Sequence, residues 1–273
     1  MTDSRQPQEK HFDLIERGLK RRNVPGILAF VGLRGLDPLL QYKILADGWG
    51  ASILAKVGLR SISPLAGVAS STSLSLLDNL NLPLPHLILL VMSVGSFAKQ
   101  SYWLVGLCAE DFPPSAAVAV SIYNTLVNST NSLLFLAAST SVLTAPREFP
   151  GTGLPYQVVL GSALFGVGMF LEIASEWQRK QFKDKPENKG KVIQEGLWGW
   201  ARHINYGGYA LWRAGYCMAA SGFIGGTIMG AWQAFDFITR GVPTLNAYCQ
   251  KRYGEQWTRF RRDVKWVLIP GVY

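Results

Sequence analysis

Residues 214–235 read AGYCMAASGFIGGTIMGAWQAF and contain no Asp, Glu, Lys or Arg. Roughly 20 apolar residues in a helix span the hydrocarbon core of a membrane, so this segment is long enough to cross it. Gly222, Gly226 and Gly230 recur every four residues, which predicts a small-residue face that another helix can approach closely. The stretch therefore predicts a membrane-embedded helical segment.

Other blocks without Asp, Glu, Lys or Arg precede this stretch. They cover residues 79–98, 112–146 and 149–171. The longest can hold one long helix, or a helix with a re-entrant part, and its Asn124, Asn128 and Asn131 need partners inside the bundle. Residues 24–45 and 51–77 are weaker candidates because charged residues interrupt them.

The composition agrees with a membrane protein. Of the 273 residues, 48% are hydrophobic and 16% are charged, against about 25% charged in a soluble domain. Three widely spaced cysteines (Cys108, Cys217 and Cys249) fit neither a closed disulfide framework nor a zinc site. We therefore expect an all-α, polytopic integral membrane bundle with about six or seven transmembrane helices and no bound metal.

The net charge of +9 comes from basic residues beside the apolar blocks, which favours membrane lipids over nucleic acid as partner. Basic segments at residues 178–194 and 240–265 should both face the cytosol. Residues 214–235 lie between them, so a C-terminal helical hairpin is predicted, with Gly225-Gly226 as the turn. Residues 1–23 begin without an apolar run and are not a cleavable signal peptide. They predict an interfacial or solvated helix carrying Phe12, Ile15 and Leu19 on one side.

Polar residues of three segments are candidates for chemistry. Glu172, Glu176, Arg179 and Lys183 fall at i, i+4, i+7 and i+11, on one face of a helix. This face is either a solvated end with ordinary ion pairs or a polar wall for a ligand.

The second segment, Gly196–Gly208, places Arg202, His203, Asn205 and Tyr206 at a membrane entrance, where polar residues are costly unless they bind something polar. An interfacial cluster anchored by Trp198 and Trp200 is the alternative. The third is the basic, aromatic tail from Tyr248 to Phe260, which could bind anionic headgroups or close over a phosphate-rich cofactor.

The three segments together resemble the membrane reductases that share the C-terminal domain of steroid 5-alpha-reductases and sterol reductases. The resemblance covers about residues 150–273. Its motifs are Glu172-x-x-x-Glu176-x-Gln178, Arg202-His203-x-Asn205-Tyr206 and Lys251-Arg252-Tyr253-Gly254 followed by Trp257. The resemblance divides the chain into three predicted parts. Residues 1–23 form a cytosolic or interfacial segment, residues 24–148 hold the N-terminal transmembrane helices, and residues 149–273 form the cofactor-binding domain.

The resemblance implies reduction of a carbon–carbon double bond in a lipophilic substrate (steroid, terpenoid or other lipid-like molecule) by NADPH. The expected location is the endoplasmic reticulum membrane, with the cofactor loop and C-terminus in the cytosol. Tyr206 and Tyr209 are the implied catalytic tyrosines, while Tyr102 and Glu110 could contribute from the N-terminal half. The implied cofactor contacts are Glu172, Glu176, Lys183, Arg202, His203, Asn205, Lys251 and Tyr253. No prediction follows for the oligomeric state.

The sequence departs from this family at two positions. Ile204 stands where many relatives have Pro, and Tyr209 stands where they tend to have Glu, which predicts a shifted substrate preference. The motif Arg-His-x-x-Tyr also resembles isoprenylcysteine carboxyl methyltransferases, which use S-adenosylmethionine. Their Glu-Glu pair is absent from residues 244–250. A membrane methyltransferase and a non-enzymatic lipid-binding protein therefore remain the alternatives.

Overall fold

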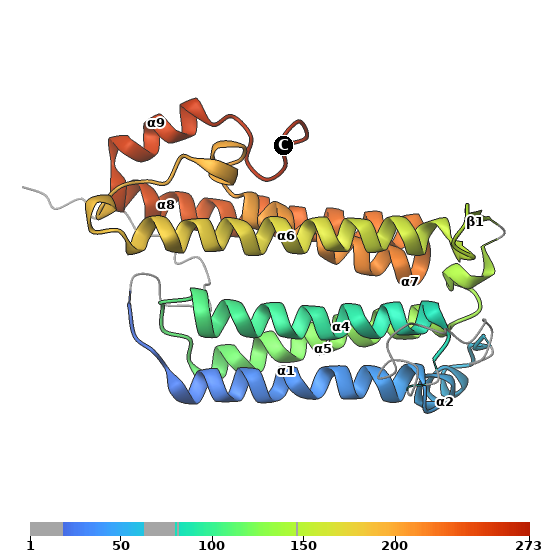
Figure 1. Ribbon diagram of the computed structural model, residues 1–273. Helices are drawn as coiled ribbons and strands as arrows, with labels where there is room; N and C mark the ends of the chain where they lie inside the picture. Colours follow the sequence, from blue (N-terminus) through green and yellow to red (C-terminus); the bar gives the residue numbers. More distant parts are fainter. Residues whose placement is uncertain (1–18, 63–79, 81, 146) are drawn as a thin grey trace, which may run out of the picture.

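The computed structural model describes residues 19–62, 80, 82–145 and 147–273, which are mostly helical (Figure 1). The helices are α1 (Val24–Leu45), α2 (Trp49–Lys56), α4 (Leu84–Tyr102), α5 (Pro114–Leu136), α6 (Tyr156–Asp184), α7 (Ile204–Asp236), α8 (Val242–Tyr253) and α9 (Glu255–Asp263). Short elements connect them: η1 (Trp103–Leu107), η2 (Val142–Thr144), η3 (Pro186–Asn188), η4 (Gly196–Gly199), η5 (Phe237–Gly241), and the paired strands β1 (Glu148–Phe149) and β2 (Leu154–Pro155). The prediction of an all-α protein is confirmed in part: these residues are mostly helical, and β1 and β2 are two-residue strands. The N-terminal helix and most of the span predicted at residues 51–77 lie outside them.

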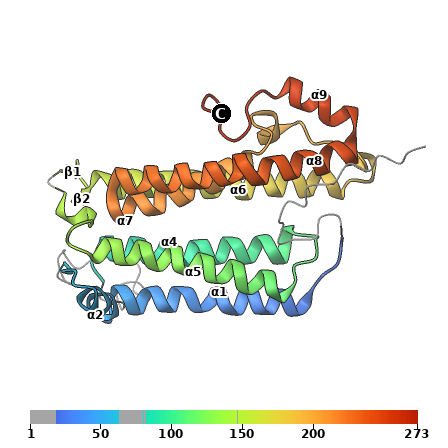
Figure 2. The same cartoon turned by 180° about the vertical axis from the view of Figure 1, so that it is seen from behind.

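The long helices form two layers that lie side by side (Figures 1 and 2). Helices α1, α4 and α5 make the first layer, and α6, α7 and α8 make the second. The chain passes from one layer to the other through η2 and the β1–β2 hairpin. Helix α9 and the final residues lie over one end of the second layer. This end also carries the two basic segments.

Glycines allow α6 and α7 to touch backbone to backbone. A Cβ atom on Gly161 would lie 2.6 Å from the amide nitrogen of Ala219, and one on Gly168 would lie 2.3 Å from that of Trp212. On α7, a Cβ on Gly215 would meet the amide nitrogen of Phe165 at 2.4 Å. Any larger side chain at these positions would push the two helices apart.

Helix α7 is the predicted hairpin, but it turns four residues earlier than expected. Ser221 and Gly222 leave the helical conformation, and Gly222 has a φ of +85°, which favours glycine. The sequence prediction placed the turn at Gly225-Gly226, and that placement is wrong. Several glycines follow one another here, and their spacing alone does not distinguish a turn from a packing contact.

The glycines after the turn pack the two limbs of α7 against each other. A Cβ on Gly226 would lie 2.7 Å from Cβ of Met218, and one on Gly230 would lie 3.1 Å from Cβ of Ala214. The predicted small-residue face is therefore confirmed for Gly226 and Gly230, while Gly222 forms the turn, and the helix that the face approaches is the first limb of the same hairpin.

Polar side chains fill the interior of the first layer. Arg34 and Asp37 of α1 form an ion pair at 2.9 Å with both side chains fully buried. Asn128 of α5 donates to Asp37 at 2.6 Å, and Gln100 of α4 donates to Asn124 at 2.8 Å. The predicted interior partners of two asparagines are thus confirmed. Asn131 is also buried but makes no hydrogen bond among the described residues, so the expectation is not confirmed for it.

Large apolar side chains cover the outside of the layers. Leu28, Leu126, Phe170 and Ile224 are between 63% and 77% exposed, although they lie on four different helices. Helices surrounded by lipid are expected to turn their polar side chains toward the interior and their apolar side chains outward, as observed here.

Two of the described helices are long and apolar enough to cross a membrane, namely Leu84–Leu107 and Tyr156–Asp184. The predicted six or seven crossings are therefore not confirmed. Helices α1 and α5 turn polar side chains into the bundle, which lowers their mean hydropathy, and the turn at Gly222 divides α7.

Substituting Gly226 tests the hairpin. We expect Gly226→Ala to lower the free energy of unfolding by about 1–3 kcal/mol, because the new methyl group overlaps Met218. Gly166→Ala in α6 is the matched control, since its Cβ meets nothing within 4 Å and alanine favours the helix. Thermal unfolding in detergent measures both. Equal melting temperatures for the two variants would contradict the packing described above.

Candidate functional site

A cavity of about 690 Å³ lies between the two layers. Its walls come from α1, α4, η1, α5 and the loop before α5 on one side, and from α6, the segment between α6 and α7, α7, η5, α8 and α9 on the other. One end, the outer end, lies beneath α8 and α9, next to Lys183, Tyr253 and Trp257. The other end, the deep end, reaches Tyr209 and Asn124 within the helices. The volume is in the range of pockets that hold a cofactor or a drug-sized ligand.

Nine of the ten residues predicted for the site line this cavity. They are Glu172, Glu176, Lys183, Arg202, His203, Asn205, Tyr206, Tyr209 and Tyr253. Lys251 is exposed on α8 and is not part of the wall. Glu110, suggested from the N-terminal half, also lines the cavity, whereas Tyr102 does not.

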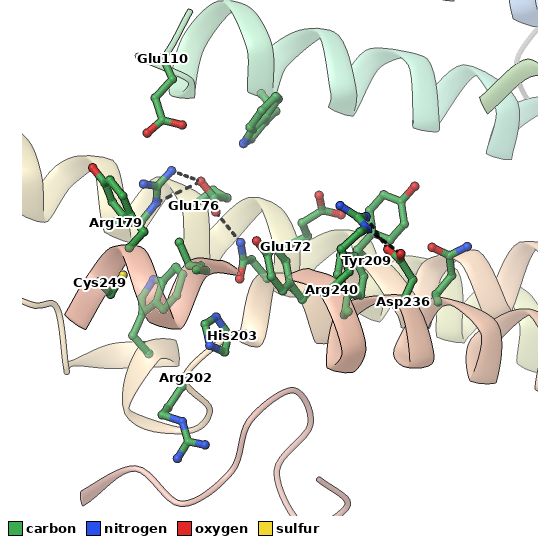
Figure 3. A pocket seen from close by; sticks show the side chains of 18 of the residues that line it. Glu110, Glu172, Glu176, Arg179, Arg202, His203, Tyr209, Asp236, Arg240 and Cys249 are labelled. Carbon is green, nitrogen blue, oxygen red and sulfur yellow. Dashed lines mark hydrogen bonds and ion pairs between the residues drawn. The ribbon is translucent and has the colours of Figure 1, made fainter. Parts of the chain in front are cut away.

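Glu176 organises the middle of the cavity (Figure 3). It is 4% exposed and accepts hydrogen bonds from Arg179 at 2.6 Å and from the side-chain nitrogen of Asn205 at 2.8 Å. The carboxylate therefore fixes the orientation of the Asn205 amide. As a result the amide oxygen of Asn205 is buried and has no hydrogen-bond partner among the described residues. It is an oriented acceptor facing the cavity.

Glu172 is one helical turn away and connects the two layers. Its carboxylate forms an ion pair with Lys99 of α4 and accepts a hydrogen bond from the indole nitrogen of Trp212 at 2.7 Å. The Lys99 side chain is 5% exposed and that of Glu172 is 14% exposed. Lys99 was not predicted, because nothing in the local sequence identifies its partner.

Lys183 and Tyr253 bring α6 and α8 together at the outer end. The ammonium group of Lys183 lies 3.2 Å from the hydroxyl oxygen of Tyr253 and also donates to the carbonyl oxygen of Lys191. Among the described residues no carboxylate pairs with Lys183. Burial raises the pKa of Tyr253, so its phenol stays protonated at neutral pH. The outer end therefore offers a cation and a hydroxyl donor.

Arg202 has a different environment from the one expected of a phosphate ligand. Its Nη1 donates to the backbone carbonyl oxygens of Arg261, Val264 and Lys265, at 3.0, 2.8 and 3.3 Å. In Figure 3 its guanidinium group points away from Glu176. Arginine commonly stabilises the end of a helix in this way. Arg202 holds the end of α9 and the segment after it, and α9 contributes Trp257 and Phe260 to the cavity wall.

His203 and Tyr206 form part of an aromatic stack along one wall. The rings of His203 and Tyr206 are nearly parallel with centroids 5.6 Å apart, and Tyr206 stacks on Phe237 at 4.4 Å. A planar group can lie against such a surface.

Tyr209 lies at the deep end and is held by a buried arginine that the sequence did not reveal. Its hydroxyl oxygen accepts from Nε and Nη2 of Arg213, at 3.1 and 3.0 Å. Further residues missing from the prediction line this end: Gln100, Tyr123, Asn124 and Gln233. In the sequence these residues are recognisable only as polar residues within or beside apolar blocks. That pattern does not show which of them contact one another in the folded protein.

Among known proteins, one relative matches over most of the chain. A protein of Ustilaginoidea virens named "Probable O-methyltransferase ustE" is 32% identical over 270 residues, which is 96% of this chain and 92% of that protein. Residues 118–264 match the family described as "Protein of unknown function (DUF1295)".

Sterol reductases match over shorter segments. The Delta(14)-sterol reductase of Ascobolus immersus is 36% identical over 89 residues, and the 7-dehydrocholesterol reductase of Danio rerio is 29% identical over 101 residues. These segments cover 30% and 34% of this chain but only 19% and 20% of the reductases. The predicted relationship to sterol reductases and methyltransferases is thus confirmed, and the chain belongs to the DUF1295 family, which is similar to the C-terminal domain of steroid 5-alpha-reductases.

Proposed function

We propose that the protein is a membrane oxidoreductase that uses NADPH to reduce a carbon–carbon double bond of a lipophilic substrate. The observation that carries this proposal is that one continuous cavity joins an outer end with polar donors and acceptors to a deep end with a tyrosine hydroxyl. Similarity to proteins named as sterol reductases supports the same class of reaction.

The residues present suit a nicotinamide cofactor. The buried amide oxygen of Asn205 lacks a donor, and the carboxamide of NADPH carries N–H groups that supply one. Lys183 and Tyr253 can hold phosphate oxygens at the outer end. Bound there, NADPH supplies a hydride. Glu176 keeps Asn205 oriented, Arg202 keeps α9 and the segment after it in place, and Lys251 is assigned no contact because it lies outside the cavity.

The substrate is assigned to the deep end, next to the first layer. Phe30, Phe112 and Val120 provide apolar parts of the cavity wall from the first-layer side, and Tyr206 and Tyr209 line the cavity from the second layer. We assign to Tyr209 the hydrogen bond or proton that the reduction requires, because its hydroxyl lines the cavity and the cation of Arg213 stabilises the negative charge left by proton donation. Tyr206 orients the reacting groups through its aromatic stack.

The proposed location is the endoplasmic reticulum membrane, with the outer end of the cavity and the C-terminus in the cytosol. The exposed apolar side chains support a membrane location, and the basic residues at the outer end support this orientation. NADPH would reach the cavity from that side, and the substrate from the lipid phase.

Methyl transfer from S-adenosylmethionine to an oxygen of a lipophilic acceptor is the second candidate. The relative named as a probable O-methyltransferase, which aligns over nearly the whole chain, favours it. Absence of a Glu-Glu pair from residues 244–250 argues against the methyltransferase pattern described above.

The two candidates differ in the cofactor that stabilises the folded protein. NADPH should raise the melting temperature of the detergent-purified protein and S-adenosylmethionine should not, since only a ligand of the folded state stabilises it. Glu176→Gln should weaken NADPH binding by about tenfold or more, because the orientation of Asn205 is lost.

Asp184→Asn on the same helix is the matched control, because its ion pair with Lys180 is exposed and should contribute at most about 1 kcal/mol to stability. Stabilisation by S-adenosylmethionine alone would establish the second candidate. Unchanged NADPH affinity in Glu176→Gln would remove Glu176 from the site.

Replacing the Tyr209 hydroxyl tests its role in the reaction. Tyr209→Phe keeps the ring and should slow single-turnover oxidation of bound NADPH by a lipophilic enone about a hundredfold. Affinity for NADPH should stay unchanged, because the hydroxyl lies at the deep end. An undiminished rate would transfer the assignment to Tyr206.

A further inference from the structure

Arg213 is a buried cation without a carboxylate partner. It is 1% exposed, and its guanidinium group donates to the hydroxyl of Tyr209, to Asn124 and, at 3.4 Å, to Asn128. The ring of Trp212 lies 4.2 Å from its central carbon. No carboxylate of a described residue is within ion-pair distance of it. All of its contacts are with neutral groups, which hold the cation in place but do not cancel its charge.

The neighbouring buried charges are already paired. Arg34 is paired with Asp37, and Lys99 is paired with Glu172. Among these five groups of the described interior, the charge of Arg213 is the one left over. A charge in a region of low dielectric constant is strongly unfavourable unless an opposite charge comes close. The deep end therefore favours an anion.

Tyr209 connects this charge to the cavity. Its oxygen accepts two hydrogen bonds from Arg213, and its proton has no acceptor among the described residues. The other amides nearby are occupied: the oxygen of Asn124 accepts from both Gln100 and Arg213, and the nitrogen of Asn124 donates to the carbonyl oxygen of Val120. The Tyr209 hydroxyl is thus a donor that faces the cavity with a fixed positive charge behind it.

We propose that the Tyr209 end of the cavity is an oxyanion subsite, which binds the ionised oxygen of a lipophilic phenol or enol. Tyr209 donates a hydrogen bond to that oxygen, and Arg213, acting through Tyr209, is a positioning residue that supplies the balancing charge. Apolar walls formed by Phe112 and Val120 hold the remainder of the ligand.

The subsite deepens the proposed function, and its role in the reaction rests on that function. When a hydride adds to an alkene conjugated with a carbonyl group, the electron pair of the double bond moves to the carbonyl oxygen and gives an enolate, which is then protonated on carbon. An ionised phenol resembles this enolate in charge and shape, so the subsite should bind it more tightly than a neutral analogue. Positive charge developing on carbon, as in protonation of an isolated alkene, is disfavoured beside Arg213.

A chromophoric phenol tests the subsite without NADPH. The probe is 4-nitro-1-naphthol, whose absorption spectrum reports its ionisation, and its methyl ether is the neutral analogue. Bound to the wild-type protein, the phenol should ionise with a pKa lower by about one unit or more than in protein-free micelles. At a pH where it is ionised it should bind about tenfold or more tightly than the ether.

Variants identify which residues lower the pKa of the bound phenol and make it bind more tightly than the ether. Arg213→Gln should abolish both the shift in the probe's pKa and the preference over the ether, and Tyr209→Phe should reduce both. Arg240→Gln is the matched control, because Arg240 lines the same cavity but is paired with Asp236 at 2.6 Å, so the variant should behave as the wild type. If Arg213→Gln fails to fold, the wild type and Tyr209→Phe decide the question.

The proposal of an oxyanion subsite would be overturned if the wild-type protein did not lower the pKa of the bound phenol, or if Arg213→Gln lowered it equally. A shifted probe in a protein that does not oxidise NADPH with any enone would overturn the proposed function and retain the subsite. NADPH-dependent reduction of an enone by a protein that does not shift the pKa of the probe would support the proposed function and overturn the subsite.

Discussion

The ion pair between Lys99 and Glu172 joins the two helical layers, and the cavity between the layers depends on it. Each residue lies in the interior, so removing either partner would leave an uncompensated charge there, at a cost of about 3–5 kcal/mol. Glu172 also accepts from Trp212, which lies where α6 and α7 are in backbone contact. One carboxylate thus fixes the first layer to the most tightly packed part of the second. The position of the polar side chains of the first layer relative to those of the second, across the cavity, depends on this ion pair.

Much of the fold followed from the distribution of charge along the sequence. Blocks without charged residues predicted the helices that now surround the cavity, and the spacing of Gly222, Gly226 and Gly230 predicted a close helical contact. The turn within α7 was predicted less accurately, because it lies at Gly222 and not at Gly225-Gly226. Helix α6 extends to Asp184, beyond the apolar block that ends at Leu171, as the placement of Glu172 to Lys183 on one helical face predicted.

The C-terminal half of the candidate site was predicted better than the N-terminal half. Residues of the motif around Arg202 and of the face containing Glu176 are close in sequence, and one helix or loop brings them together. Lys99, Asn124 and Arg213 come from three helices, and their association depends on how the layers pack. Even within the motif, position in the sequence did not reveal orientation: the side chain of Arg202 holds the segment after α9.

The central claim of this account is that the cavity brings a nicotinamide cofactor and a lipophilic substrate together for hydride transfer. Mass spectrometry of the product formed with NADPH that carries deuterium at the transferring position of the nicotinamide ring tests it most directly. We predict a reduced product that carries one deuterium on a former alkene carbon, and no such product from Tyr209→Phe under single-turnover conditions on the same timescale. A product without deuterium, or one that has gained a methyl group from S-adenosylmethionine, would contradict the account.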